Sequence, residues 1–169
     1  TATTPPPSAL VHYWSFNTAA TLTTPTQTIG GGNITITPTG TFTSDTGQGF
    51  VAANGRNGAV AGTHLRVNNP LGATVTIAAP TTGYQNIIVR YETRRSTQGA
   101  GTQTVSYSLD GTSFVPFTTV TVQDGTPVVI PLDFSTIPAA GNNPDFALRI
   151  TFQQGTGGVA GNNRFDNPT

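Results

Sequence analysis

The chain has 169 residues, and its seven arginines balance its seven acidic residues, so the formal net charge is zero. A chain of this length is most simply one domain with a real hydrophobic core. The balanced charge leaves no basic stripe of the kind that nucleic-acid binders use, and the absence of cysteine excludes disulfides and thiolate metal sites. No apolar run approaches the roughly 18 residues needed to cross a bilayer. We therefore expect neither a nucleic-acid partner nor membrane insertion.

Residues 1–9 are predicted to be an extended Pro-rich arm or linker. Three consecutive prolines, Pro5, Pro6 and Pro7, fix φ and remove backbone donors, so neither a helix nor a central strand can form there. The start at Thr1 without Met suggests a removed leader or a trimmed chain. We expect residues 10–169 to form a single domain.

Threonine alternates with valine and isoleucine along much of this domain, as in Ala73–Ile77 and Thr118–Val122. A period of two is the strand period, and these residues suit a pleated, half-buried surface. We predict strands at 10–17, 33–37, 40–44, 63–68, 73–78, 85–95, 102–109, 113–122, 127–134 and 145–153, with a last one near Arg164. Asp110-Gly111 predicts a tight hairpin, and a single helical turn is expected near Phe134–Ile137. Short strands separated by turns predict an all-β fold, a two-sheet antiparallel sandwich of the jelly-roll type.

The predicted strand at 85–95 concentrates charge in a chain that has little. Alternation places Arg90, Glu92 and Arg94 on one face of it, where they could contact sugar hydroxyls. Sugar binding also needs an aromatic platform, for which Tyr91 and Tyr107 are candidates, with Trp14 more simply a core residue. Cross-strand ion pairing on a solvated sheet would produce the same pattern, so both interpretations stay open.

Catalytic chemistry finds no support in the sequence. The two histidines, His12 and His64, accompany no nucleophile motif, and Glu92 is the only glutamate. We expect no enzyme activity and no cofactor. A structural calcium ion remains open, with Asp166 and Asn163 as the best local oxygen ligands and Asp45 as a distant one, although turn stabilisation is the preferred explanation of these residues.

Several segments resemble a known domain type. Leu10–Asn17 (LVHYWSFN), Thr82–Tyr91 (TGYQNIIVRY), Val105–Phe114 (VSYSLDGTSF), Asn143–Ile150 (NPDFALRI) and Gly161–Asn167 (GNNRFDN) look like "hYWxFN", "GYxNIxlxY", "YSxDGxxF", "NPxFxlRI" and "GNNRfDNI" of secreted Bacteroidetes β-sandwich domains. Such domains sit in cell-surface and type IX-secreted proteins, mostly without an assigned activity. The resemblance implies a secreted or cell-surface jelly-roll-like module and no catalytic residues.

In that family the FDN motif runs on into a final strand, whereas here Pro168 and Thr169 follow it. Proline cannot donate to a ladder, so either the chain was cut here or the last strand is shortened and leaves an open sheet edge at Arg164 and Phe165. That edge, or the arm with Thr3, Pro5, Pro6 and Pro7, is predicted to mediate self-association into a filament. The preferred function is a non-catalytic structural or adhesive module, such as a subunit of a surface fibre or a repeat of a large surface protein. A carbohydrate-binding module with a cell-surface glycan as partner is the alternative.

Overall fold

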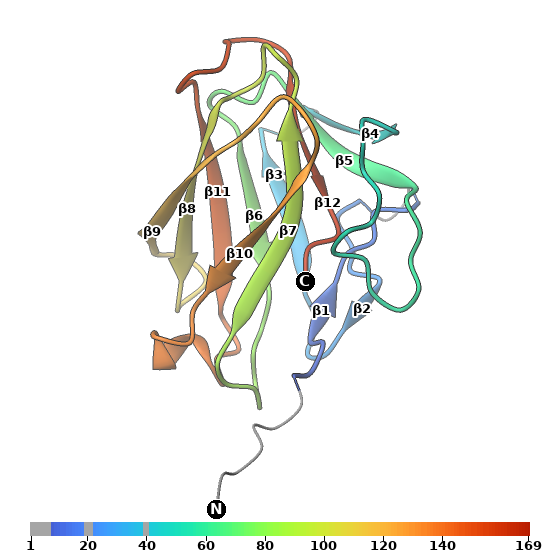
Figure 1. The fold of residues 1–169 in the computed structure, drawn as a ribbon. Coiled ribbons are helices and arrows are strands. Elements are labelled where there is room, and N and C mark those ends of the chain that lie inside the picture. Colours follow the sequence, from blue (N-terminus) through green and yellow to red (C-terminus); the bar gives the residue numbers. More distant parts are fainter. Residues whose placement is uncertain (1–7, 19–21, 39–40) are drawn as a thin grey trace, which may run out of the picture.

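The computed structural model describes residues 8–18, 22–38 and 41–169. Two five-stranded antiparallel sheets stack face to face, and a two-stranded sheet flanks them (Figure 1). The only helical element in these ranges is a 3₁₀ turn at Pro138–Ala140. The predicted all-β sandwich is therefore confirmed.

One sheet, which we call the charged sheet, carries most of the ionisable side chains. Its strand order is β10 (Val128–Asp133), β7 (Ile88–Arg95), β12 (Asn162–Asp166), β5 (Thr63–Asn68) and β4 (Phe42–Thr46). The other, the threonine sheet, has the order β3 (Asn33–Thr37), β6 (Thr74–Ala78), β11 (Ala147–Gln153), β8 (Thr102–Ser108) and β9 (Phe114–Thr121). The flanking sheet pairs β1 (His12–Tyr13) with β2 (Gln27–Thr28).

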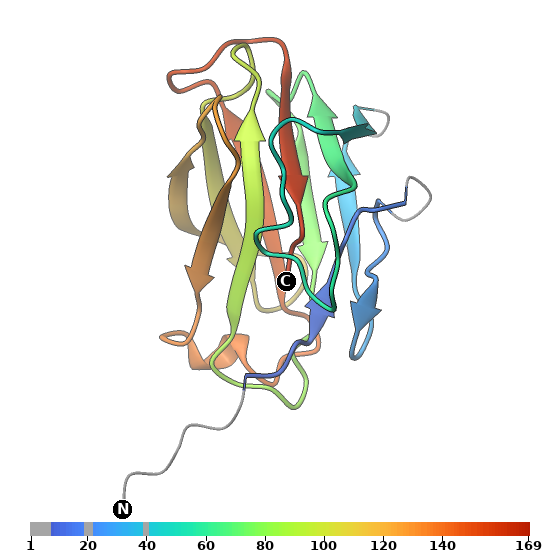
Figure 2. The same cartoon turned by 45° about the vertical axis from the view of Figure 1, so that its right-hand side comes forward.

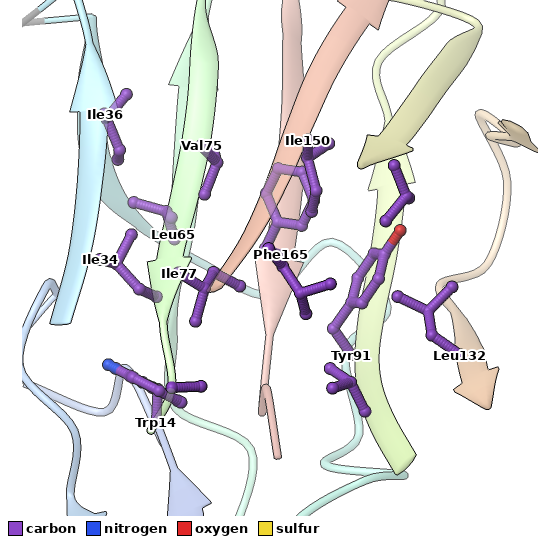
Figure 3. Close-up of a cluster of buried hydrophobic side chains, with 14 of the residues drawn as sticks. Trp14, Ile34, Ile36, Leu65, Val75, Ile77, Tyr91, Leu132, Ile150 and Phe165 are labelled. Carbon is purple, nitrogen blue, oxygen red and sulfur yellow. The ribbon is translucent and has the colours of Figure 1, made fainter. Parts of the chain in front are cut away.

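The core lies between the two large sheets and follows from the alternation in the sequence. In β11, Leu148, Ile150 and Phe152 are buried while Arg149 and Thr151 between them are partly exposed. Trp14 closes the lower part of the core, and Tyr91 faces inward from the charged sheet (Figure 3). Every second side chain of each strand thus enters one shared apolar layer.

The turns also match the sequence. In the β8–β9 hairpin, the Oδ1 atom of Asp110 accepts hydrogen bonds from the backbone N–H groups of Thr112 and Ser113, at 2.8 and 2.6 Å. These bonds hold the pKa of Asp110 well below its usual value, and Gly111 supplies the positive φ of 74° that the turn requires. The turn expected at Phe134–Ile137 is present as a backbone hydrogen bond from Ile137 to Phe134, and the 3₁₀ turn follows it.

The predicted open edge at Arg164 and Phe165 is wrong. Both residues lie in β12, which pairs with β5 on one side and β7 on the other, in the middle of the charged sheet. Both side chains are buried. Strand order depends on contacts between segments far apart in the sequence, so the local motif did not reveal it.

The arm residues Thr3, Pro5, Pro6 and Pro7 lie outside the described residues. Among those that are described, no helix is long and apolar enough to span a membrane.

Candidate functional site

The outer face of the charged sheet is covered by a loop rather than open to solvent. The segment between β4 and β5 runs across this face (Figure 2). Its Asn54 donates a backbone hydrogen bond of 2.7 Å to Oε1 of Glu92, and the Oε1 atom also accepts one of 2.9 Å from the Asn167 side chain. Glu92 is consequently only 1% exposed. The part of the charged face around Glu92 is therefore an internal layer between sheet and loop.

Asp166 lies directly opposite Glu92 in the β7–β12 ladder and is equally buried. Burial first, and then the neighbouring Glu92 carboxylate, raises the pKa of Asp166 from 3.8 to about 7. The backbone N–H of Asn167 donates to Asp166 Oδ1 at 2.9 Å, and the Tyr13 hydroxyl donates to Asn167 Oδ1 at 2.6 Å. These bonds attach β1 and the covering loop to the end of β12, so we interpret the carboxylate pair as part of a structural network.

The structure separates the two residues expected to hold calcium. Asn163 and Asp166 lie three positions apart in one strand, so their side chains are on opposite faces. The Asn163 amide accepts from the backbone N–H of Ala100 at 2.9 Å and donates to its carbonyl at 3.0 Å. Within the described part of the chain, no group of three or more His, Asp or Glu residues could hold a metal ion. Calcium stays a prediction.

A second cluster of ionisable side chains surrounds Asp45 on β4, which is itself partly exposed. Its Oδ2 atom lies 3.3 Å from Nε of Arg164, 3.4 Å from Nη1 of Arg66 and 3.9 Å from Nε2 of His64. His64 is fully buried against the Phe50 ring, with a centroid separation of 4.4 Å. Burial lowers the pKa of His64 to about 4, so the imidazole is neutral at pH 7. Asp45 is thus engaged by arginines of its own sheet and not by Asp166.

The residues expected to form a sugar platform do not meet on one surface. Tyr91 points into the core, where its hydroxyl donates to Gln103 at 3.0 Å, so it faces away from Arg90, Glu92 and Arg94. Tyr107 belongs to the threonine sheet and packs against the inward-facing ring of Phe134. Trp14 is 2% exposed. The sequence-based platform is therefore wrong, because alternation sends Tyr91 inward while the loop covers Glu92.

The outer face of the threonine sheet is solvent-facing and almost uncharged. Registered pairs place one threonine from each of its five strands in a continuous row: Thr37, Thr74, Thr151, Thr104 and Thr119. Neighbouring strands lie about 4.8 Å apart, so the row presents regularly spaced methyl and hydroxyl groups. Beside it, the guanidinium of Arg149 stacks on the Phe114 ring at 3.7 Å. The sequence predicts hydroxyl-rich strand faces, but the row itself exists only once five strands are in register.

Comparison with known proteins supports the fold. No family model and no curated protein matches the chain. Among solved structures, it is similar to the K1 cleaved adhesin domain of Lys-gingipain from Porphyromonas gingivalis W83, with 11% identity, a TM-score of 0.58 and coverage of 92% of this chain and 94% of that one. It is also similar to the K2 cleaved adhesin domain of Lys-gingipain, with 9% identity, a TM-score of 0.49 and coverage of 80% of this chain and 86% of that one. A family 11 carbohydrate-binding module from Clostridium thermocellum has 10% identity to this chain, a TM-score of 0.49 and coverage of 95% of each chain. The K1 similarity shows that this chain has the same kind of β-sandwich.

Proposed function

We propose that this protein is a non-catalytic adhesive or structural β-sandwich module of an extracellular or cell-surface protein, which binds its partner through the outer face of the threonine sheet. The observation that carries the proposal is the contrast between its two outer faces. The face with charges is covered by the β4–β5 loop, whereas the face with the threonine row is open. The full-length similarity to a gingipain adhesin domain supports the same class of function.

The chemistry of the threonine face suits binding better than catalysis. It offers hydroxyl donors and acceptors with methyl groups between them, and its central charged group, Arg149, is already stacked on Phe114. The close carboxylates, Glu92 and Asp166, are buried beneath the loop and bonded to amides. A general acid or base must reach its substrate, and these carboxylates are not placed to do so.

Hydroxyl-rich surfaces recognise polar polymers, so a cell-surface glycan is the second candidate partner. It would bind at the threonine face and not at Arg90, Glu92 and Arg94, because that face carries Arg149 stacked on Phe114, an aromatic–cation pair that is partly exposed. Self-association is a separate prediction. The outer strands available for it are β3, β9, β4 and β10, since β12 is internal.

The proposal is tested by presenting the purified domain to a glycan array and to intact bacterial and host cells. We expect saturable binding to a glycan or a cell surface, without release of sugar or peptide products from the bound material. Turnover of the bound material would show an enzyme. A domain that is folded but binds neither array nor cells would remove the adhesive role.

A further inference from the structure

Three arginines lie side by side on the outer face of the charged sheet. Arg164 of β12 is registered against Arg66 of β5 on one side and against Arg94 of β7 on the other. Leu65 and Phe165, which alternate with them, are buried in the core. Directly opposite residues of neighbouring strands have Cβ atoms about 4.5–5.5 Å apart, and like charges at such positions destabilise a sheet. This arginine row therefore needs negative charge beside it.

The described residues supply one carboxylate to the arginine row. Oδ2 of Asp45 accepts from Nε of Arg164 at 3.3 Å and from Nη1 of Arg66 at 3.4 Å. Both distances are long, since charge-assisted hydrogen bonds of this kind are usually about 2.7–2.9 Å. Glu92 and Asp166 lie two positions further along β7 and β12, but among the described residues neither forms an ion pair with the row. Three positive charges thus share one carboxylate.

The central arginine of the row also has hydrogen-bonding capacity that the fold leaves unused. The side chain of Arg164 is only 7% exposed, and its Nη1 atom is buried without a partner in the described part of the chain. Arg94 differs, because its Nη1 and Nη2 atoms donate to the backbone carbonyls of Gln48 and Asp124, at 2.7 and 2.8 Å. Those carbonyls satisfy hydrogen bonds but carry no net charge. A buried charged donor without an acceptor is costly, so Arg164 indicates an acceptor that this chain does not provide.

The arginine row is accessible at its Arg66 end. The side chain of Arg66 is 37% exposed and that of Asp45 is 23% exposed. Nε of Arg66 donates to Oδ1 of Asn68 at 2.7 Å, which holds its guanidinium against the sheet. At the other end, the contact of Gln48 with Arg94 places the β4–β5 loop over the row. A small group can therefore approach the row from the side of β4, whereas a bulky one would meet the loop.

We propose that the arginine row binds a small tetrahedral oxyanion, free sulfate or phosphate, at Arg66 and Arg164. Guanidinium groups present paired N–H donors that match the oxygens of such anions. A dianion would offset the two positive charges that Asp45 leaves, which a single carboxylate would not. His64, beside Asp45, is neutral at pH 7 and adds no charge to the row.

NMR of the arginine Nε–H groups tests the proposal during a titration with sodium sulfate, at an ionic strength held constant with sodium chloride. We expect the signals of Arg66 and Arg164 to shift saturably, and sodium phosphate to give the same result. Arg66→Gln should weaken the affinity for sulfate about tenfold or more, because it removes a charge-assisted donor. Arg90→Gln is the matched control, since Arg90 lies on the same face of β7 but four positions from Arg94, and it should leave the affinity unchanged.

Asp45→Asn should have the opposite effect to Arg66→Gln. It removes the carboxylate that competes with the anion for Arg66 and Arg164, so the affinity for sulfate should rise by roughly threefold or more. A rise in one variant and a fall in the other would identify the row as the site, because binding to any exposed arginine would not depend on Asp45.

Dextran sulfate, with unsulfated dextran as its control, separates free ions from sulfate esters carried on a polymer. Shifts of Arg66 and Arg164 that dextran sulfate produces and inorganic sulfate and phosphate do not would overturn the proposal of a free ion. The absence of any saturable shift, or equal sulfate affinities for the wild type and Arg66→Gln, would overturn it as well. None of these measurements involves the threonine face, so their outcome is independent of the proposed adhesive function.

Discussion

At the scale of single residues, burial controls the charges of this protein more than ion pairing does. Asp166 shows this most clearly, since its carboxyl is desolvated and faces the Glu92 carboxylate across the ladder. Because its folded-state pKa of about 7 is above its unfolded value of 3.8, the fold binds the proton more tightly than the unfolded chain. The resulting stability is fully present below about pH 4 and is lost as the pH rises through 7.

We therefore expect Asp166→Asn to be more stable than the wild type above pH 7 and to lose that advantage toward pH 4. The pH-dependent part of the difference should be on the order of 4 kcal/mol at most. Urea unfolding at several pH values measures it. Glu92→Gln is the control, because removing the neighbouring charge should shift the transition to lower pH. A difference that does not vary between pH 4 and 8 would show that Asp166 titrates normally in the fold.

The contribution of His64 to the stability of the fold changes with pH in the opposite direction to that of Asp166. Its folded-state pKa is lowered to about 4 from 6.5, so its stability contribution is present above pH 6.5 and is lost as the pH falls toward 4. Because the two effects oppose each other in the wild type, the effect of Asp166 is obtained as the difference in the free energy of unfolding between the Asp166 variant and the wild type. Neither ring nitrogen has a hydrogen-bond partner among the described residues.

His64→Leu should therefore stabilise the protein, by about 1–3 kcal/mol at pH 5, because it removes buried polar atoms that lack partners while keeping contact with Phe50. Thermal unfolding at pH 5 and pH 8 checks this, and the gain should be larger at pH 5. A loss of stability at both values would mean that the imidazole makes a bond that its surroundings do not indicate.

At the scale of elements, β12 connects the parts of the molecule. It lies in the middle of the charged sheet, and its inward-facing Asn163 holds the backbone of Ala100 through both a donor and an acceptor. Asn163 is completely buried. Its role is to fix the loop between β7 and β8 against the sheet.

Asn163→Ala should reduce the free energy of unfolding by about 2–3 kcal/mol, because it leaves two buried backbone groups of Ala100 without partners. Asn163→Asp keeps the acceptor but removes the donor and adds charge, so it should cost at least as much. Chemical denaturation of both variants gives the values. If Asn163→Ala unfolded like the wild type, the side chain would not fix the loop.

The positions of the strands and the alternation of their side chains were predictable from the sequence, whereas the segments that lie next to each strand in space were not. Alternation such as that of Leu148, Ile150 and Phe152 depends only on the strand period, so most strands were predicted correctly. The burial of Glu92 depends on Asn54, which lies 38 positions away in the sequence. The alternation itself would have placed Asn163 and Asp166 on opposite faces, so that error was avoidable.

At the scale of the whole molecule, the sandwich separates a covered charged face from an open hydroxyl face. The β4–β5 loop and the C-terminal residues cover the first, whereas the second has only side chains between backbone and solvent. A binding function of this molecule should consequently depend on which of its two sheets is altered.

The most direct test of this account is the binding of two matched variants to the surface that the wild-type domain recognises. Thr151→Glu places a charge in the middle of the threonine row, and Thr43→Glu places the same charge on an exposed threonine of the charged sheet. With both variants folded, as judged by circular dichroism, we expect Thr151→Glu to weaken binding at least about tenfold, equivalent to roughly 1.4 kcal/mol, and Thr43→Glu to leave it unchanged. Equal affinities for both variants, or a loss confined to Thr43→Glu, would contradict the assignment of binding to the threonine face.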